Sequence, residues 1–245
     1  MDGSTTRARR RYKLADVIPV GAGAESLPGS PRVGGVSEFQ GFPVAALDFY
    51  DDLEMDNTKS FWEAHKHTYA ESVKAPMVAL TDALADEFGT AKIFRPYRDV
   101  RFSKDKLPYK THQGAFVRVG EATGWYLQIG APGVMVGAGF YHADGNALRR
   151  VRTAIDEERR GTELEKLIKS LSRKGFVIGG ETLKTAPRGY DVEHPRIDLL
   201  RHKSLVMRSD YGFEPFIHTG KLLDRVRKDW RALRPLIEWV NREIG

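Results

Sequence analysis

Three consecutive runs of strand-forming residues between positions 115 and 141 constrain the fold most. The runs AFVRVG, GWYLQIG and VMVGAGFYH are rich in β-branched and aromatic residues, and glycine or proline turns separate them. Helical patterns stand in blocks before and after these runs and do not alternate with them. Consecutive strands joined by short turns favour antiparallel pairing, whereas alternating strands and helices favour parallel βαβ units. We therefore predict an α+β fold with an antiparallel sheet.

The flanking segments carry apolar residues at three- and four-residue spacing, which is typical of helices with one buried face. We expect a helix that opens at Pro43, and a second one that Asp56 or Asn57 caps, that Pro76 kinks or divides, and that ends at Gly89. Further helices are expected over 146–160 and 162–172 with Gly161 between them, a long basic helix over 221–243, and short strands over 176–178 and 204–208.

Residues 1–40 differ in composition from the rest of the chain. Glycine and proline are spread through them, aromatic residues are few, and Arg9, Arg10 and Arg11 form a basic cluster. Such a segment cannot build a core, so we predict a flexible basic N-terminal arm. Residues 41–245 are predicted to form a single α+β domain, which is long enough to fold without a disulfide or a metal.

Several classes of protein are excluded by what the sequence lacks. The chain contains no cysteine, which excludes thiol nucleophiles, iron–sulfur clusters, disulfides and cysteine-zinc sites. No apolar run reaches the roughly 20 residues of a membrane helix, and no apolar stretch follows the N-terminal arginines as it would in a secretory signal. We expect a cytoplasmic protein that does not bind a membrane. The sequence predicts no metal site and identifies no cofactor.

The net charge of +6 is unevenly distributed along the chain. The arm contributes +2, and residues 95–110, with six basic and two acidic residues, contribute +4, so the remainder is neutral. A charge confined to one short segment indicates a local anion site, whereas a uniform basic coat would indicate general nucleic-acid affinity. The alternative is that this segment pairs with residues 41–90, which hold three lysines against ten acidic residues.

The basic segment 95–110 has the side chains that bind anions. Guanidinium groups bind phosphate or carboxylate through two parallel hydrogen bonds, and lysine adds a point charge. Tyr97, Phe102 and Tyr109 are interleaved and would allow stacking on a base or ring. No phosphate-binding glycine loop with a lysine is present. The predicted anion-binding residues of this segment are Arg98, Arg101, Lys104, Lys106 and Lys110.

A second segment, PRGYDVEHP at 187–195, combines rigid turn residues with polar side chains. We expect Arg188 to join the anion site, so that the two segments meet and line one cleft. The proton-transfer candidates of the two segments are Asp99, Asp105, Asp191 and His194. The alternative for Asp191 and His194 is a structural one, in which they form a turn and cap the following helix. Whether the protein is an enzyme stays open.

Three long motifs resemble one protein family. They are NTKSFWEAHKHTYAESVKAP, YRDVRFSKDKLPYKTHQGA, and LKTAPRGYDVEHPRIDLLRHKS at 183–204. They resemble the bacterial and fungal domain family of unknown function numbered 2461, over about residues 42–208. The resemblance implies that 98–110 and 187–195 are the defining features of the family, and it implies no particular activity.

These observations favour a protein that binds a phosphorylated or otherwise anionic small molecule, with or without a reaction. The alternative is a nucleic-acid or ribonucleoprotein-binding accessory protein that uses the arm, segment 95–110 and the basic last helix. A third interpretation is a protein–protein adaptor whose charges pair internally. Salt dependence separates the first two, because binding through many phosphates weakens steeply with salt. The sequence does not assign an oligomeric state.

Overall fold

The computed structural model describes residues 38–101, 106–141 and 143–244. Its centre is a six-stranded sheet in the order β1-β2-β3-β4-β6-β5, in which every neighbouring pair is antiparallel. The strands are β1 (Lys92–Ile93), β2 (His112–Arg118), β3 (Thr123–Gly130), β4 (Gly133–Phe140), β5 (Val177–Gly179) and β6 (Leu205–Gly212). The predicted antiparallel sheet is confirmed, and the consecutive strands β2, β3 and β4 correspond to the three runs seen in the sequence.

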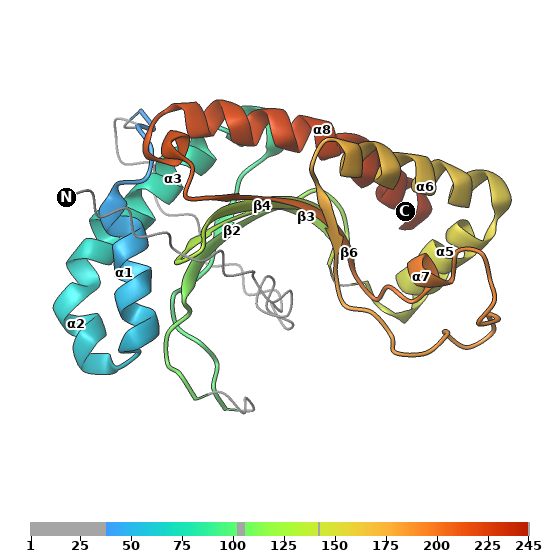
Figure 1. Cartoon of the computed structure of the whole chain (residues 1–245), viewed down its shortest axis with the longest axis horizontal. Helices are drawn as coiled ribbons and strands as arrows, with labels where there is room; N and C mark the ends of the chain where they lie inside the picture. The colour runs from blue at the N-terminus through green and yellow to red at the C-terminus, as the bar shows by residue number, and fades with distance from the viewer. Residues whose placement is uncertain (1–37, 102–105, 142, 245) are drawn as a thin grey trace, which may run out of the picture.

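The helices flank this sheet in two groups, and one long helix crosses it (Figure 1). The first group is α1 (Val44–Met55), α2 (Lys59–Thr68), the π-helical turn η2 (Tyr69–Lys74), α3 (Ala75–Asp82) and α4 (Ala85–Phe88). The second group is α5 (Gly145–Asp156), α6 (Glu158–Arg173) and α7 (Ile197–Leu200), and the short 3-10 turn η3 (Pro215–His218) leads into α8 (Lys221–Ile244). The α+β class and the long C-terminal helix are therefore confirmed. No helix among the described residues has both the length and the apolar character to cross a membrane.

Helix α8 covers one face of the sheet because one stripe of the helix is apolar. Trp230 of α8 stacks on Trp125 of β3 with ring centroids 5.7 Å apart, and Phe88 of α4 meets both rings edge-on at 5.1 and 5.3 Å. The rest of the stripe is buried as well: Leu222, Val226, Leu233, Leu236, Ile237 and Val240. The main core therefore lies between α8 and the sheet.

The N-terminal helices differ from expectation at two local points. Thr58 caps α2, accepting a hydrogen bond from the Phe61 N–H at 3.3 Å, because Asn57 is engaged elsewhere. The expected break at Pro76 is preceded by the π-helical turn η2, and α3 starts at the residue before the proline. A proline lacks the N–H that a regular helix needs, and the wider turn accommodates that loss.

The break between α5 and α6 lies at Glu157 and not at Gly161, which corrects the expected boundary. Glu157 has an extended backbone, and its carboxylate accepts hydrogen bonds from the N–H groups two and three residues further on. Gly161 lies inside α6, where a Cβ atom would come 2.2 Å from the Ile155 carbonyl oxygen and 2.9 Å from the Arg196 side chain. This glycine therefore permits a close approach and does not end a helix.

The main core includes Phe39, which precedes the expected start of the domain. Phe39 is only 4% exposed, and its ring meets Phe42 edge-on at a centroid distance of 5.8 Å. The Phe42 N–H also donates to the Ile217 carbonyl oxygen at 2.9 Å, which ties this segment to the turn before α8.

Removal of residues 1–37 is expected to leave the thermal midpoint nearly unchanged. Phe39→Ala is expected to lower the free energy of unfolding by about 3 kcal/mol, because it opens a cavity in the core. The exposed Val44 offers a matched control, since Val44→Ala removes apolar atoms without making a cavity. Calorimetry of the four proteins is the measurement. If the deletion lowers the thermal midpoint as much as Phe39→Ala does, the arm packs as part of the domain.

Candidate anion-binding site

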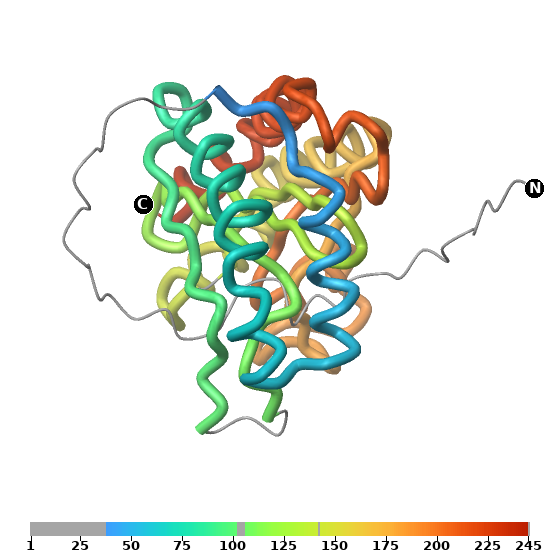
Figure 2. Tube along the Cα trace, turned by 90° about the vertical axis from the view of Figure 1, so that its left-hand side faces the viewer, coloured from blue at the N-terminus to red at the C-terminus, as the bar shows by residue number. Residues whose placement is uncertain are grey.

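The basic segment 95–110 is a hairpin that extends β1 and β2 beyond the sheet. The Arg98 N–H donates to the Pro108 carbonyl oxygen at 2.9 Å, and the Lys110 N–H donates to the Pro96 carbonyl oxygen at 2.8 Å. The hairpin runs beside the N-terminal helices and reaches past them (Figures 1 and 2). Lys104 and Asp105 lie outside the described residues.

Aromatic rings and one asparagine fix the base of the hairpin to α2. The ring of Tyr109 stacks on Trp62 with centroids 4.4 Å apart and planes 8° apart, and Tyr97 lies 5.8 Å from Trp62. The Asn57 side chain donates to the Tyr109 carbonyl oxygen and accepts from the Tyr109 N–H, both at 3.0 Å. Tyr109 is buried and Tyr97 half exposed. The structure thus gives these rings an anchoring role, where the sequence had suggested a stacking platform. Phe102 lies outside the described residues.

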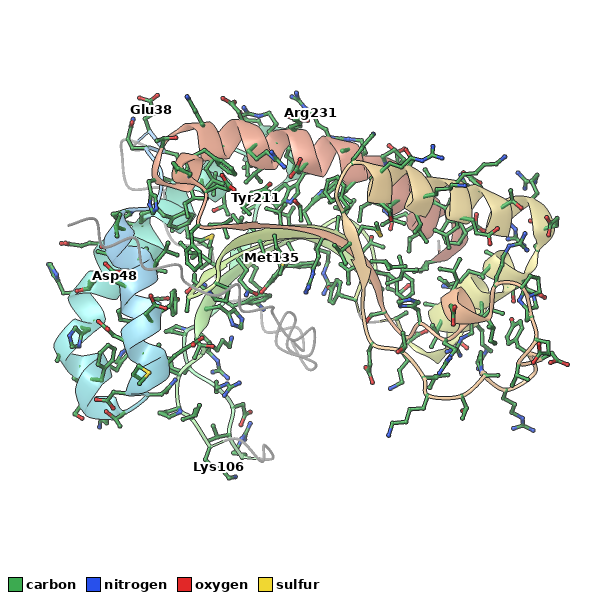
Figure 3. The ribbon with its side chains drawn as sticks, viewed as in Figure 1. Glu38, Asp48, Lys106, Met135, Tyr211 and Arg231 are labelled. Atoms are coloured by element: carbon green, nitrogen blue, oxygen red, sulfur yellow. The ribbon has the colours of Figure 1, made fainter. Side chains whose placement is uncertain are left out.

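The outer part of the hairpin already satisfies much of its own charge. Arg101 forms a two-pronged pair with Asp99, with Nε–Oδ1 at 3.0 Å and Nη2–Oδ2 at 2.7 Å. Hydrogen bonds from the Arg101 side chain and N–H lower the pKa of Asp99 to about 2. Asp99 is therefore a carboxylate at neutral pH and a weak candidate for proton transfer. Lys106 donates to the Val100 carbonyl oxygen at 2.9 Å and lies at the exposed end of the hairpin (Figure 3).

The inner part of the hairpin holds positive charges close together. Lys110 is half-buried, its Nζ donates to the Arg95 carbonyl oxygen at 2.9 Å, and it lies 5.4 Å from the centre of the Phe94 ring. Burial, together with repulsion from Arg95 and Arg98, lowers the pKa of Lys110 to about 8. Among the described residues, the two charged groups that shift the pKa of Lys110, Arg95 and Arg98, are thus both positive.

His112 lies next to this cluster at the start of β2. Burial, with repulsion from Lys110 and Arg98, lowers the pKa of His112 to about 4. The imidazole is therefore neutral at pH 7, with one ring nitrogen that donates and one that accepts. The sequence analysis did not select His112 as a site residue, because its meaning depends on burial beside Lys110.

Two acidic residues of the region 41–90, Glu87 and Glu63, pair with cations outside the hairpin. Glu87 accepts two hydrogen bonds from Arg231 of α8, at 2.6 and 2.8 Å, and also meets Arg227 and Arg234. Glu63 pairs with Lys66 within α2 at 2.8 Å. These two acids do not compensate the hairpin.

The second segment, 187–195, lies at the opposite edge of the sheet from the hairpin. It belongs to the connection between β5 and β6, whereas the hairpin joins β1 to β2, and the strand order puts these pairs at opposite ends. The two segments therefore do not lie side by side, contrary to the expectation of one shared cleft. Arg188 is exposed and stands apart from the hairpin cations.

Asp191 and His194 form the turn of the structural alternative, but neither side chain caps α7, whose N-terminus has no side-chain cap. The Asp191 carboxylate accepts from the Glu193 N–H at 2.9 Å, and its carbonyl oxygen accepts from the His194 N–H at 3.2 Å. His194 Nδ1 accepts from the Arg196 N–H at 3.0 Å, and Nε2 lies 3.0 Å from Asp156 Oδ1. Both residues thus shape a turn that leads into α7.

Arg196 is the residue that holds this segment to α6, and the sequence analysis missed it. It is 7% exposed, with Nε 3.0 Å from Glu165 and Nη2 2.7 Å from Glu158 and 2.9 Å from Thr162. Its place directly after the second motif was the one signal in the sequence. Among the described residues, no group of three or more His, Asp or Glu side chains could hold a metal ion.

Comparison with known proteins identifies a family. The model of the family described as "Conserved hypothetical protein (DUF2461)" matches residues 45–239, which extends beyond the expected limit at 208 into α8. No curated protein and no solved structure matches the chain. Because the match spans most of the chain and includes both motif segments, the protein belongs to the DUF2461 family.

Proposed function

We propose that the protein binds a phosphorylated or otherwise anionic small molecule at the base of the hairpin. Arg95, Arg98 and Lys110 form the centre of this site, and Arg101 and Lys106 extend it along the hairpin. Lys104, which lies outside the described residues, stays a predicted member of the site. Arg188 is left out because it lies at the other edge of the sheet. The observation that carries the proposal is the half-buried Lys110 ammonium between like charges.

Burial and repulsion both raise the free energy of the charged Lys110 side chain. A bound anion would reverse the repulsion and accept hydrogen bonds from the ammonium, which has three donors and gives one to Arg95. Charge-assisted hydrogen bonds of this kind are about twice as strong as neutral ones. Phosphate suits the cluster because its several oxygens can meet an ammonium and a guanidinium together.

The proposal concerns binding and leaves a reaction aside. Asp99 is held as a carboxylate by Arg101, and Asp191 and His194 lie in a turn at the far edge of the sheet. Neutral His112, whose pKa Lys110 helps to lower, can both donate and accept a proton.

The nucleic-acid alternative has less support. It joins the hairpin and α8 into one surface, but α8 covers the face of the sheet from which the hairpin points away (Figure 1). Glu87 also compensates part of the α8 charge, since Arg227, Arg231 and Arg234 all meet this carboxylate. A salt titration of binding decides between the two, because contact with many phosphates makes affinity fall steeply.

Inorganic phosphate is expected to raise the melting temperature of the wild type. Lys110→Met should need at least ten times more phosphate for the same rise in melting temperature. Stability of the variant without phosphate should hold or rise, because a repelled charge is removed. Arg101→Ala should have a smaller effect, since Arg101 is already paired with Asp99. Lys228→Met on α8 is the matched control, as this exposed lysine lies outside the site. Thermal melts at a series of phosphate concentrations measure all four proteins.

The opposite pattern would contradict the proposal. If phosphate leaves every melting temperature unchanged while Lys110→Met clearly destabilises the protein, the basic cluster is structural. An equal loss of response in Lys110→Met and Lys228→Met would mean that phosphate acts through net charge alone.

The pKa of His112 tests the electrostatics of the cluster independently. The pKa of His112 is about 4 in the folded protein and near 6.5 in the unfolded chain, so the unfolded chain takes up a proton first as the pH falls. The free energy of unfolding should therefore decline between pH 6.5 and pH 4. In Lys110→Met the pKa should rise, since one repelling charge is gone. An NMR titration of the imidazole, with exposed His67 as the internal reference, measures both proteins. A wild-type His112 pKa at its ordinary value would contradict the claim that burial and nearby positive charges lower it.

A further inference from the structure

The face of the sheet away from α8 combines buried polar groups with apolar ones. Side chains alternate along a strand, and Trp125 faces α8, so Tyr126 and Gln128 of β3 face the other way. The strand register places the neighbours of these two residues on the same face: Gly137 and Met135 on β4, and Arg208 and Asp210 on β6. Met135 is labelled on the sheet in Figure 3.

Three nitrogen atoms on this face are buried and have no hydrogen-bond partner among the described residues. They are Nε2 of Gln128 and both Nε and Nη1 of Arg208. Gln128 is fully buried, and its Oε1 already accepts from the Tyr126 hydroxyl at 2.7 Å. Asp210 lies 3.4 Å from Arg208 Nε, at ion-pair distance. Gln128 Nε2 and Arg208 Nη1 are both donors, so the missing partner is an acceptor.

Glycine separates the two sets of donors. Gly137 lies between Tyr126 and Arg208 in the register, and a Cβ atom there would come within 3.3 Å of Arg208 Cβ. Gly114 on β2 is similar, because a Cβ atom would lie 2.6 Å from the Tyr126 hydroxyl oxygen. The sheet therefore presents bare backbone where side chains would otherwise crowd the polar groups.

An apolar cluster adjoins these donors. Phe116, Tyr126 and Met135 form a second buried cluster, distinct from the main core, against which Phe94 and Tyr141 pack. Phe116 and Tyr141 meet edge-on with ring centroids 4.5 Å apart. A ligand that satisfies both features has oxygen acceptors at one end and an apolar body at the other.

We propose that this face binds a small carboxylic acid with an apolar, ring-sized body. Its carboxylate accepts hydrogen bonds from Arg208 and from Gln128 Nε2, and its body lies on Phe116 and Met135. Asp210 offsets part of the Arg208 charge, so a singly charged carboxylate suits the site better than a phosphate dianion. The residues differ from those of the hairpin site, and the proposal stands without it.

The alternative is that the unpaired donors are imperfections of packing. A buried donor without a partner costs stability, and its replacement by an apolar side chain of similar shape then stabilises the protein. Ligand binding distinguishes the two explanations, because a packing fault does not respond to a carboxylate.

Benzoate is the probe, and benzyl alcohol is the uncharged control with the same ring. Titration of the full chain with benzoate, followed by NMR of the side-chain amides, should shift the Gln128 NH2 signals. Those of Gln113 should stay in place, since its Nε2 already donates to the carbonyl oxygens of Phe94 and Gly114, both at 2.8 Å. Benzyl alcohol should bind at least tenfold more weakly than benzoate.

Variants supply the second measurement. Gln128→Leu and Arg208→Met should each weaken benzoate binding at least tenfold by calorimetry, and Arg231→Met on α8 should leave it unchanged (Figure 3). Failure of wild-type Gln128 to respond to benzoate would overturn the proposal even if neither variant folds. Equal binding of benzoate and benzyl alcohol would overturn it too, because the carboxylate would then have no partner. Phosphate binding at the hairpin is measured separately, so either proposal can fail alone.

Discussion

The stacking of Trp230 on Trp125, closed by Phe88, is the contact on which the arrangement of the molecule depends. It joins α8, the sheet and the N-terminal helices at one point. Aromatic pairs of this size bury large apolar areas and favour defined ring geometries. Once α8 occupies one face, the alternation of side chains assigns Gln128 and Arg208 to the other. The position of one helix thus decides where the polar groups of the sheet lie.

The two family motifs divide into residues that hold the chain and residues that carry charge. In the first, Tyr109 is held by Asn57 and Trp62, which keeps Lys110 beside Arg98. Directly after the second, buried Arg196 binds the carboxylates of α6 and holds that segment to the helix. Of these two segments, the hairpin is therefore the one on which we place the proposed phosphate site.

Charge is balanced differently in different parts of the molecule. On α8, carboxylates such as Glu87 and Asp229 meet the arginines, with Arg225 Nε 3.1 Å from Asp229. At the hairpin base, Arg95 and Arg98 are the charged groups among the described residues that shift the pKa of Lys110, and both are positive. On the face of the sheet away from α8, Arg208 has Asp210 beside it. This contrast is the reason why we propose phosphate for the hairpin and a monocarboxylate for the sheet.

Local sequence determined the helices, the three long strands and the concentration of charge in residues 95–110, because periodicity and composition act over a few residues. Tertiary structure decided the rest. Gly161 looked like a helix end but serves a close contact with Arg196, and Asn57 looked like a cap but binds Tyr109. The polar Gln128 within a buried strand was a signal in the sequence, yet its meaning needed the register. The separation of the two motifs followed from the strand order, in which β6 pairs with β4 and places the second motif at the far edge. Pairing between distant strands depends on how whole faces pack, and no short window of sequence contains that information.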